Sequence, residues 1–256
     1  MAELRVIKVG GNEADDPQWL AALARGLAEL PGQAVLVHGG GKEVTELQRV
    51  LGAEARWQEG LRVTTPEVLR AVTMVLSGAV NKRLVGALLD ARVDAVGLSG
   101  EDGALLLARL AAGGALGRVG EVVEVRMELL WSLLAQGITP VVSPVSRGTD
   151  GRPLNVNADD AAAAIAASLG ATELLLVSNV AGVQVGGVTL SELEAEEIEP
   201  LIATGVASGG MAPKLRAAAS AIRAGVGCVR IGGIEMLVER FAGTRIRATS
   251  LAGVQG

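Results

Sequence analysis

Two lysines of this 256-residue chain occupy places where a lone cation is costly. Lys8 lies inside the apolar run Leu4–Val9, directly before Gly10 and Gly11. An unpaired ammonium group is expensive to bury, so Lys8 is expected to have an anionic partner. Lys214 opens a predicted helix, where the helix dipole disfavours a cation unless an anion lies beside it. Both lysines indicate anion chemistry, although a solvent-facing lysine remains the alternative for each.

Glycines follow several predicted strands directly. Gly10 and Gly11 follow the first strand, Gly39–Gly41 the second, and the 178–182 turn and Gly232–Gly233 two later ones. In a doubly wound sheet such turns lie along the carboxyl edge of the strands, where backbone N–H groups can approach an anion. The row of glycine turns indicates an extended polyanionic ligand. For any one of them, simple turn closure explains the glycines equally well.

The common nucleotide-binding motifs are absent. Gly41–Lys42 is followed by Glu43, so the chain has no GxxxxGK[ST] sequence, and no GxGxxG sequence follows a predicted strand. The pattern therefore supports neither a P-loop nor a Rossmann dinucleotide site. A nucleotide would have to be bound by a different kind of phosphate-binding loop.

Polar residues cluster before an alanine-rich helix, in the segment 155–160. Asn157 or Asp159 can cap that helix, which is the most common use of Asn and Asp there. Capping needs only one of them, so at least one polar side chain is available for a ligand or a lysine. Arg62 has the fork that binds a carboxylate, but it is equally well explained as a surface arginine. His38 is either a base or, more simply, a residue that ties down a loop.

Short apolar runs alternate with longer segments of helical period, which predicts a three-layer α/β/α sandwich around a mostly parallel sheet. The strands are expected at 4–9, 34–37, 95–98, 139–143, 174–178 and 228–231. The helices are expected at 18–30, 43–51, 66–91, 127–136, 158–169, 193–204, 214–224 and 235–241. Segments 56–65 and 104–125 are expected to be inserted hairpins. With no linker, we expect a single domain of two lobes, 1–170 and 171–256, sharing one sheet.

Composition excludes several classes of protein. A formal charge of −5 with thinly spread basic residues, and an aromatic content of 2%, argue against nucleic acid binding. One cysteine and one histidine exclude a disulfide within the chain and a clustered His/Cys metal site. We find no export signal and expect no membrane-spanning segment, because the apolar runs are interrupted by glycine or charge. A cytoplasmic protein is expected.

Seven motifs in order resemble the amino acid kinase family. They are VIKVGG (6–11), VHGGG (37–41), GLRVT (60–64), GRVGEV (117–122), PVVSP (140–144), NVNADDAA (155–162) and GGMAPK (209–214). The resemblance spans nearly the whole chain and is strongest to members that phosphorylate the γ-carboxylate of N-acetyl-L-glutamate in arginine biosynthesis. It implies a carbamate kinase-like fold, an N-terminal lobe for the acyl substrate, a C-terminal lobe for ATP with Mg²⁺, and a homodimer built around the central sheet.

The resemblance also assigns roles to residues. Lys8 and Lys214 resemble the lysines that neutralise the transferred phosphoryl group, and Asp159 the carboxylate that orients them. The acyl substrate is expected to be held by Gly40, Gly41, Arg62 and Asn155. The nucleotide is expected to be held by Gly10, Gly11, Asn179, Val183, Ser208, Gly209, Gly210 and Met211. No metal-ligating protein residue is expected, because the nucleotide would hold Mg²⁺.

Two departures keep alternatives open. Asn179 stands where the family usually has Asp, and the SNVAG and GLSGEDG segments resemble a sister kinase that acts on carrier-linked aminoadipate or glutamate. Against that sister kinase, GLRVT and NVNAD are of the acetylglutamate type. A non-catalytic nucleotide-binding module is the third possibility, but it would not need both lysines. The chain begins at the first strand, without the extra N-terminal helix that the resemblance associates with hexameric, arginine-inhibited members, so we expect a dimer that is insensitive to arginine.

Overall fold

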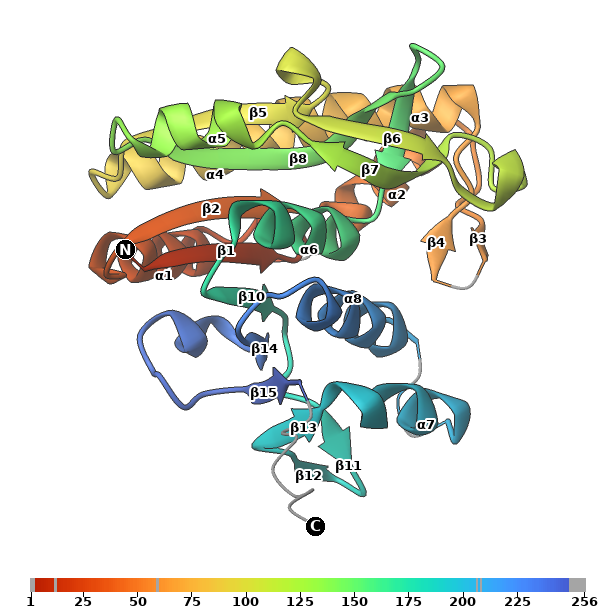
Figure 1. The fold of residues 1–256 in the computed structure, drawn as a ribbon. Coiled ribbons are helices and arrows are strands. Elements are labelled where there is room, and N and C mark those ends of the chain that lie inside the picture. The colour runs from red at the N-terminus through yellow and green to blue at the C-terminus, as the bar shows by residue number, and fades with distance from the viewer. Residues whose placement is uncertain (1–2, 12, 59, 206, 208, 249–256) are drawn as a thin grey trace.

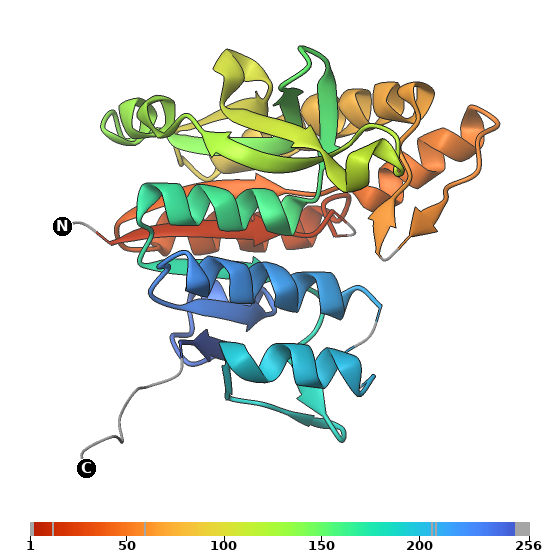
Figure 2. The ribbon, with the colours of Figure 1, turned by 45° about the vertical axis from the view of Figure 1, so that its right-hand side comes forward.

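One twisted sheet runs through the molecule, with helices on both faces (Figures 1 and 2). The computed structural model describes residues 3–11, 13–58, 60–205, 207 and 209–248. The sheet order is β13-β15-β14-β10-β1-β2-β8-β6-β7-β9, and β5 pairs with β8 as an edge strand. Its strands are β1 (Leu4–Val9), β2 (Gln33–His38), β5 (Ala95–Gly100), β6 (Leu106–Leu110), β7 (Val119–Val125), β8 (Thr139–Gly148), β9 (Pro153–Val156), β10 (Glu173–Val177), β13 (Glu192–Glu194), β14 (Val229–Gly232) and β15 (Thr244–Arg247).

The centre of the sheet is parallel and buried on both faces. β1 lies between β10 and β2, and all three run in the same direction. Val6 belongs to the core on one face, with α6 (Ala158–Leu169) and α8 (Met211–Arg223), whereas Ile7 belongs to the core on the other face. Burial on both faces explains why these strands are almost uninterrupted apolar runs.

The opposite face carries α1 (Pro17–Glu29), α2 (Gly41–Val50) and a long helical rod. The rod consists of α3 (Pro66–Thr73), the π-helical segment η1 (Met74–Val80) and α4 (Asn81–Asp90). Thr65 caps it, and Pro66 occupies its first turn, where the missing N–H of proline costs no hydrogen bond. By length and composition alone the rod could cross a membrane, whereas no such segment was expected from the sequence. One of its faces packs against the sheet, as the core helix of a globular fold does.

Most predicted elements are confirmed. β1 and α6 have the predicted bounds, and α5 (Met127–Leu134) forms within its predicted segment. Segment 56–65 contains the hairpin β3 (Trp57–Gln58) and β4 (Leu61–Arg62). Segment 104–125 also forms a hairpin, but its strands β6 and β7 extend the main sheet instead of standing apart from it.

One predicted helix is confirmed only in its second half, and another is wrong. Segment 193–204 begins as strand β13 and a short 3-10 turn, and only α7 (Ile198–Ala203) is helical. Segment 235–241 contains only the 3-10 turn η5 (Ile234–Leu237). Strands β9 and β15, and the small hairpin β11 (Gln184–Val185) and β12 (Val188–Thr189), were not predicted. These short strands depend on partners distant in sequence, as in the pairing of Glu192 with Arg245.

Candidate active site

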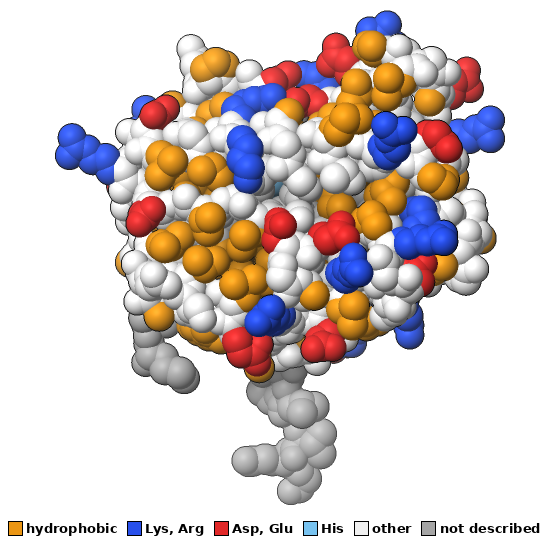
Figure 3. All heavy atoms as spheres, turned by 90° about the horizontal axis from the view of Figure 1, so that it is seen from above, with side chains coloured by type: hydrophobic (Ala, Val, Ile, Leu, Met, Phe, Trp, Pro, Cys, Tyr) orange, Lys and Arg blue, Asp and Glu red, His pale blue; other side chains and the backbone are white. Residues whose placement is uncertain are grey.

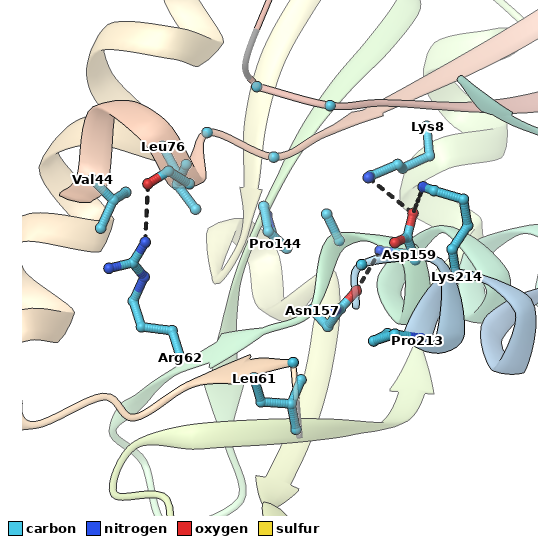
Figure 4. A pocket seen from close by; sticks show the side chains of 18 of the residues that line it. Lys8, Val44, Leu61, Arg62, Leu76, Pro144, Asn157, Asp159, Pro213 and Lys214 are labelled. Carbon is cyan, nitrogen blue, oxygen red and sulfur yellow. Dashed lines mark hydrogen bonds and ion pairs between the residues drawn. The ribbon is translucent and has the colours of Figure 1, made fainter. Parts of the chain in front are cut away.

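A cavity of about 380 Å³ opens at the carboxyl edge of the central strands (Figure 4). Its size suits a small-molecule site. The glycine turns after β1 and β2, the hairpin β3–β4, the start of α6 and the start of α8 all contribute to its wall. Among the predicted site residues, the lining includes Lys8, Gly10, Gly11, Gly40, Gly41, Arg62, Asn155, Asp159, Asn179, Gly210 and Lys214.

The centre of the cavity is a carboxylate shared by two lysines. Asp159 Oδ1 lies 2.9 Å from Lys8 Nζ and 3.1 Å from Lys214 Nζ, as the dashed lines in Figure 4 mark. The lysines come from β1 and α8, and the carboxylate from the first turn of α6. All three side chains are about nine-tenths buried. The anionic partner expected for Lys8 is therefore Asp159, which Lys8 shares with Lys214.

Burial and mutual charge shift the pKa values of this trio. Burial raises the pKa of Asp159, but the charges of Lys8 and Lys214 outweigh that effect and hold the pKa below its usual value. For Lys214, burial and the neighbouring Lys8 lower the pKa to about 8, although Asp159 opposes the shift. Two cations facing one carboxylate leave the trio with a net positive charge. An incoming phosphoryl group can compensate that charge.

The first two glycine turns pass so close to each other that side chains are excluded. A Cβ on Gly11 would lie 2.1 Å from the Gly40 Cα, and a Cβ on Gly40 would lie 2.5 Å from the Leu76 side chain. Gly11 is therefore required by the contact of the β1–α1 and β2–α2 turns, and Gly40 by its contact with η1, and not only by turn geometry. Gly41 begins α2 beside them, so backbone N–H groups of a helix start face the cavity.

Arg62 lies at the other end of the cavity, in β4. Its guanidinium donates to the Gly41 carbonyl at 2.9 Å, to Thr45 Oγ1 at 2.8 Å and to Gln48 Oε1, all on α2. The ring of Trp57 covers the guanidinium at 4.3 Å. Its fixed position and place in the cavity wall rule out a freely solvated surface arginine. Burial lowers the pKa of Arg62, but an arginine remains charged at any physiological pH.

His38 is completely buried at the end of β2 and does not line the cavity. Its Nδ1 lies 2.9 Å from the Gly39 carbonyl and its Nε2 lies 3.1 Å from the Asn81 amide nitrogen. Burial lowers the pKa of His38 to about 4, so the ring is neutral at physiological pH. The interpretation of His38 as a residue that ties down a glycine turn is confirmed.

The structure separates the remaining predicted nucleotide residues. Gly209 and Met211 flank the cavity residue Gly210 but do not themselves line the cavity. The Val183 side chain is buried in the core, and its backbone N–H donates to Thr244 Oγ1. Ser208 lies outside the described residues. The role of these four in binding a nucleotide stays a prediction.

Several residues that line the cavity were not predicted as site residues. Trp57, Glu13 and Pro213 line the wall. Asn155, which was predicted, donates from Nδ2 to Thr64 Oγ1 at 3.0 Å. A rare aromatic five residues before Arg62 was the one available signal for Trp57. Among the described residues, no group of three His, Cys, Asp or Glu side chains could hold a metal ion.

The sequence matches a known family. A profile of the Amino acid kinase family matches residues 3–233. The chain belongs to the amino acid kinase family. A curated acetylglutamate kinase of Roseiflexus sp. (strain RS-1) is 49% identical over 237 residues, which cover 92% of this chain and 90% of the relative.

Solved structures share this fold. The smu.665 protein of Streptococcus mutans UA159 superimposes with a TM-score of 0.85 and 30% identity, covering 96% of this chain and 99% of that one. Carbamate kinase from Giardia lamblia, at 17% identity and a TM-score of 0.72, shares the fold over 96% of this chain and 99% of that one. The predicted fold class is thus confirmed.

Proposed function

We propose that this amino acid kinase transfers the γ-phosphoryl group of ATP to the γ-carboxylate of N-acetyl-L-glutamate, in arginine biosynthesis. The observation that carries the proposal is Asp159 Oδ1 held between Lys8 and Lys214, at the bottom of a cavity with an arginine at its other end. The similarity to a curated acetylglutamate kinase supports the same substrate.

The reaction needs alignment and charge compensation more than proton transfer. A carboxylate is already ionised at neutral pH, so its oxygen attacks the γ-phosphorus without a general base. The new O–P bond forms as the bond to the β–γ bridging oxygen breaks, and the electron pair leaves with ADP. This chemistry leaves the buried, neutral His38 without a catalytic duty, as its position away from the cavity requires.

Lys8 and Lys214 supply the charge compensation. Their ammonium groups flank one oxygen of Asp159 and lie where a phosphoryl group can approach both of them. Asp159 keeps the two like charges together in the absence of a ligand. Fixed charges in a buried site act strongly on charge that develops in the transition state, because no solvent must reorganise.

Arg62 and Asn155 hold the acyl end. The guanidinium of Arg62 is anchored by neutral oxygens of α2, so no protein carboxylate competes for its charge among the contacts described for it. A small free α-carboxylate suits that environment better than a carrier-linked amide does. The feature therefore favours free N-acetylglutamate over the carrier-linked substrates of the sister kinase.

ATP would enter from the side of Asn179 and Gly210. Since the described residues offer no acidic cluster for a metal, Mg²⁺ would be held mainly by the phosphates of the nucleotide. When bound there, Mg²⁺ neutralises phosphate charge. The protein's part is the pair of lysines and the backbone N–H groups of the glycine turns.

Hydroxylamine trapping tests the proposal directly. The enzyme is incubated with ATP and Mg²⁺ and with N-acetylglutamate, glutamate or aminoadipate in parallel, and the acyl phosphate is captured as hydroxamate. We expect hydroxamate from N-acetylglutamate alone. If no free acid reacts while ATP still binds, the proposal is wrong and a carrier-dependent kinase or a regulatory module takes its place.

We further propose that the chain works as a cytoplasmic homodimer that joins along β5. β5 is an edge strand, and the neighbouring surface exposes the apolar side chains of Met74, Leu89, Met127 and Trp131. Figure 3 views the molecule from this side and shows hydrophobic side chains gathered between charged ones. An exposed edge strand beside apolar groups favours pairing with a second chain.

Light scattering tests the dimer. The expected mass is twice the 26.0 kDa of one chain, and Leu89→Glu should lower it to that of a monomer. Val188→Glu, at an exposed site on β12, is the matched control and should leave the dimer intact. A monomeric wild-type protein, or a hexamer, would contradict the proposal.

A further inference from the structure

A second cavity lies at the opposite edge of the sheet from the candidate active site. The amino ends of β1, β10 and β14 line it, together with β15 and the segment after η5. Its volume is about 520 Å³, which suits a small metabolite. None of its lining residues belongs to the cavity that holds Lys8, Asp159 and Lys214.

The charge of this second cavity is opposite to that of the whole chain. Its charged lining residues are Glu3, Arg5, Glu173, Arg230, Arg240, Arg245 and Arg247. Five arginines therefore face two glutamates, in a protein whose formal net charge is −5. Such a concentration of one sign in a concave site favours a ligand of the other sign.

The two most buried arginines are satisfied by the protein itself. Glu173 accepts from Arg230 Nε at 2.7 Å and from Arg5 Nε at 3.2 Å. Arg230 also donates to the carbonyls of Met236 and Glu239, both at 3.0 Å, which fastens the segment around η5 to the sheet. These contacts form the floor of the cavity and leave no need for a ligand at Arg5 or Arg230.

The outer arginines are different. Arg245 stands directly opposite Arg230 in the antiparallel pair of β14 and β15. Like charges facing each other across two strands destabilise a sheet. Arg247 has Glu192 at 3.1 Å, but the side chains of Arg240 and Arg245 have no hydrogen bond or ion pair with any described residue. The cavity thus has two uncompensated guanidinium groups at its rim.

We propose that this cavity binds a small metabolite carrying a phosphate group or at least two carboxylates, and that the side chains of Arg240 and Arg245 bind its oxygens. The guanidinium fork matches the oxygens of both groups and can bind them through two parallel hydrogen bonds. A bound oxyanion would also relieve the repulsion between Arg230 and Arg245. A cationic ligand such as arginine is disfavoured by the same charges. The site does not depend on the proposed kinase reaction.

Cys228 makes the site measurable without an activity assay. It is the chain's single cysteine, is partly exposed and lines this cavity. Burial and the nearby Glu173 raise the pKa of its thiol, so its labelling by a disulfide reagent should be slow and easy to follow at mildly alkaline pH. The rate is measured at constant ionic strength with citrate, inorganic phosphate, L-arginine or chloride.

We expect citrate or phosphate to protect Cys228 saturably, with labelling about tenfold slower at ten times the Kd. Citrate alone would indicate a polycarboxylate ligand, and phosphate alone a phosphate-bearing ligand. Arg240→Gln and Arg245→Gln should abolish the protection. Arg216→Gln, which removes an exposed arginine of α8 outside the cavity, is the matched control and should retain it.

Each variant is compared with its own rate without anion, because Arg245 itself lowers the pKa of the thiol. If Arg245→Gln does not fold, Arg240→Gln still tests the site, since that side chain is exposed. The proposal is overturned if neither anion protects better than chloride, if arginine protects equally, or if protection persists in Arg240→Gln.

Discussion

The two ends of the active-site cavity hold positive charge in different ways. At one end, Lys8 and Lys214 share the charged Asp159, and all three are buried. At the other, Arg62 is held by neutral oxygens of α2 and covered by Trp57. The lysine end depends on a balance of charges that a phosphoryl group can alter. The arginine end depends on a fixed geometry that keeps a full charge available for a carboxylate.

The difference predicts that substitutions of Lys8 or Lys214 reduce turnover, whereas substitutions of Arg62 weaken substrate binding. Groups that stabilise charge only in the transition state affect kcat, and groups that bind the substrate throughout affect KM.

Removing either lysine should have the largest effect. Lys8→Met and Lys214→Met each delete a cation beside the transferred phosphoryl group, and losing one such donor commonly costs about 3 kcal/mol, or on the order of a hundredfold in kcat. Hydroxamate formation at saturating substrate measures the loss. Lys42→Met is the control, because Lys42 is exposed and pairs with Asp15 away from the cavity. Wild-type turnover in either site variant would contradict the assignment.

Replacing Arg62 should change KM more than kcat. Arg62→Lys keeps the charge but loses the planar fork and its contacts with α2. Since a hydrogen bond to a charged group contributes about 1.5–3 kcal/mol, the KM for N-acetylglutamate should rise roughly ten- to a hundredfold. Arg49→Lys, on the exposed surface of the same helix, should leave KM unchanged. A large loss of kcat with an unchanged KM would remove the proposed contrast between the two ends.

The pH dependence should report Lys214. Because the pKa of this lysine is lowered to about 8, the free enzyme loses the ammonium as pH rises through that value. We expect kcat/KM for ATP to fall about tenfold per pH unit above it. A constant kcat/KM up to pH 10 would show that the reaction does not require a charged Lys214.

Stability should move in the opposite direction over the same range. The unfolded chain keeps the Lys214 proton up to its ordinary pKa of 10.5, so it binds more protons than the folded chain above pH 8. The contribution of Lys214 to the free energy of unfolding therefore rises with pH between these values. Thermal unfolding followed along the same pH series distinguishes the loss of a charge from denaturation.

The smallest effect is expected at His38. With a pKa of about 4, the ring stays neutral from pH 5 to 8 and cannot produce a titration there. His38→Gln should lower stability by about 1 kcal/mol through its hydrogen bonds while the shape of the pH profile stays the same. If a kinetic pKa between 6 and 7 is present in the wild type and absent in the variant, His38 has a catalytic role after all.

Local sequence patterns predicted the central part of the fold well. β1 and α6 need only a buried apolar run and a capped, glycine-terminated helical segment, which the sequence displays directly. Segment 193–204 has a helical period, yet Glu192–Glu194 pairs with β15 instead. A strand that forms only because a distant segment lies beside it cannot be predicted from its own residues.

The sequence by itself determined which residues could take part in the chemistry, because lysines in costly places and glycines after strands are local features. Only the tertiary structure decided that Lys8 and Lys214 share one oxygen of Asp159, and that Arg62 turns its fork toward α2. Those contacts join strands and helices that are distant in the chain. Their geometry follows from the packing of the whole sheet, and no local pattern of residues predicts it.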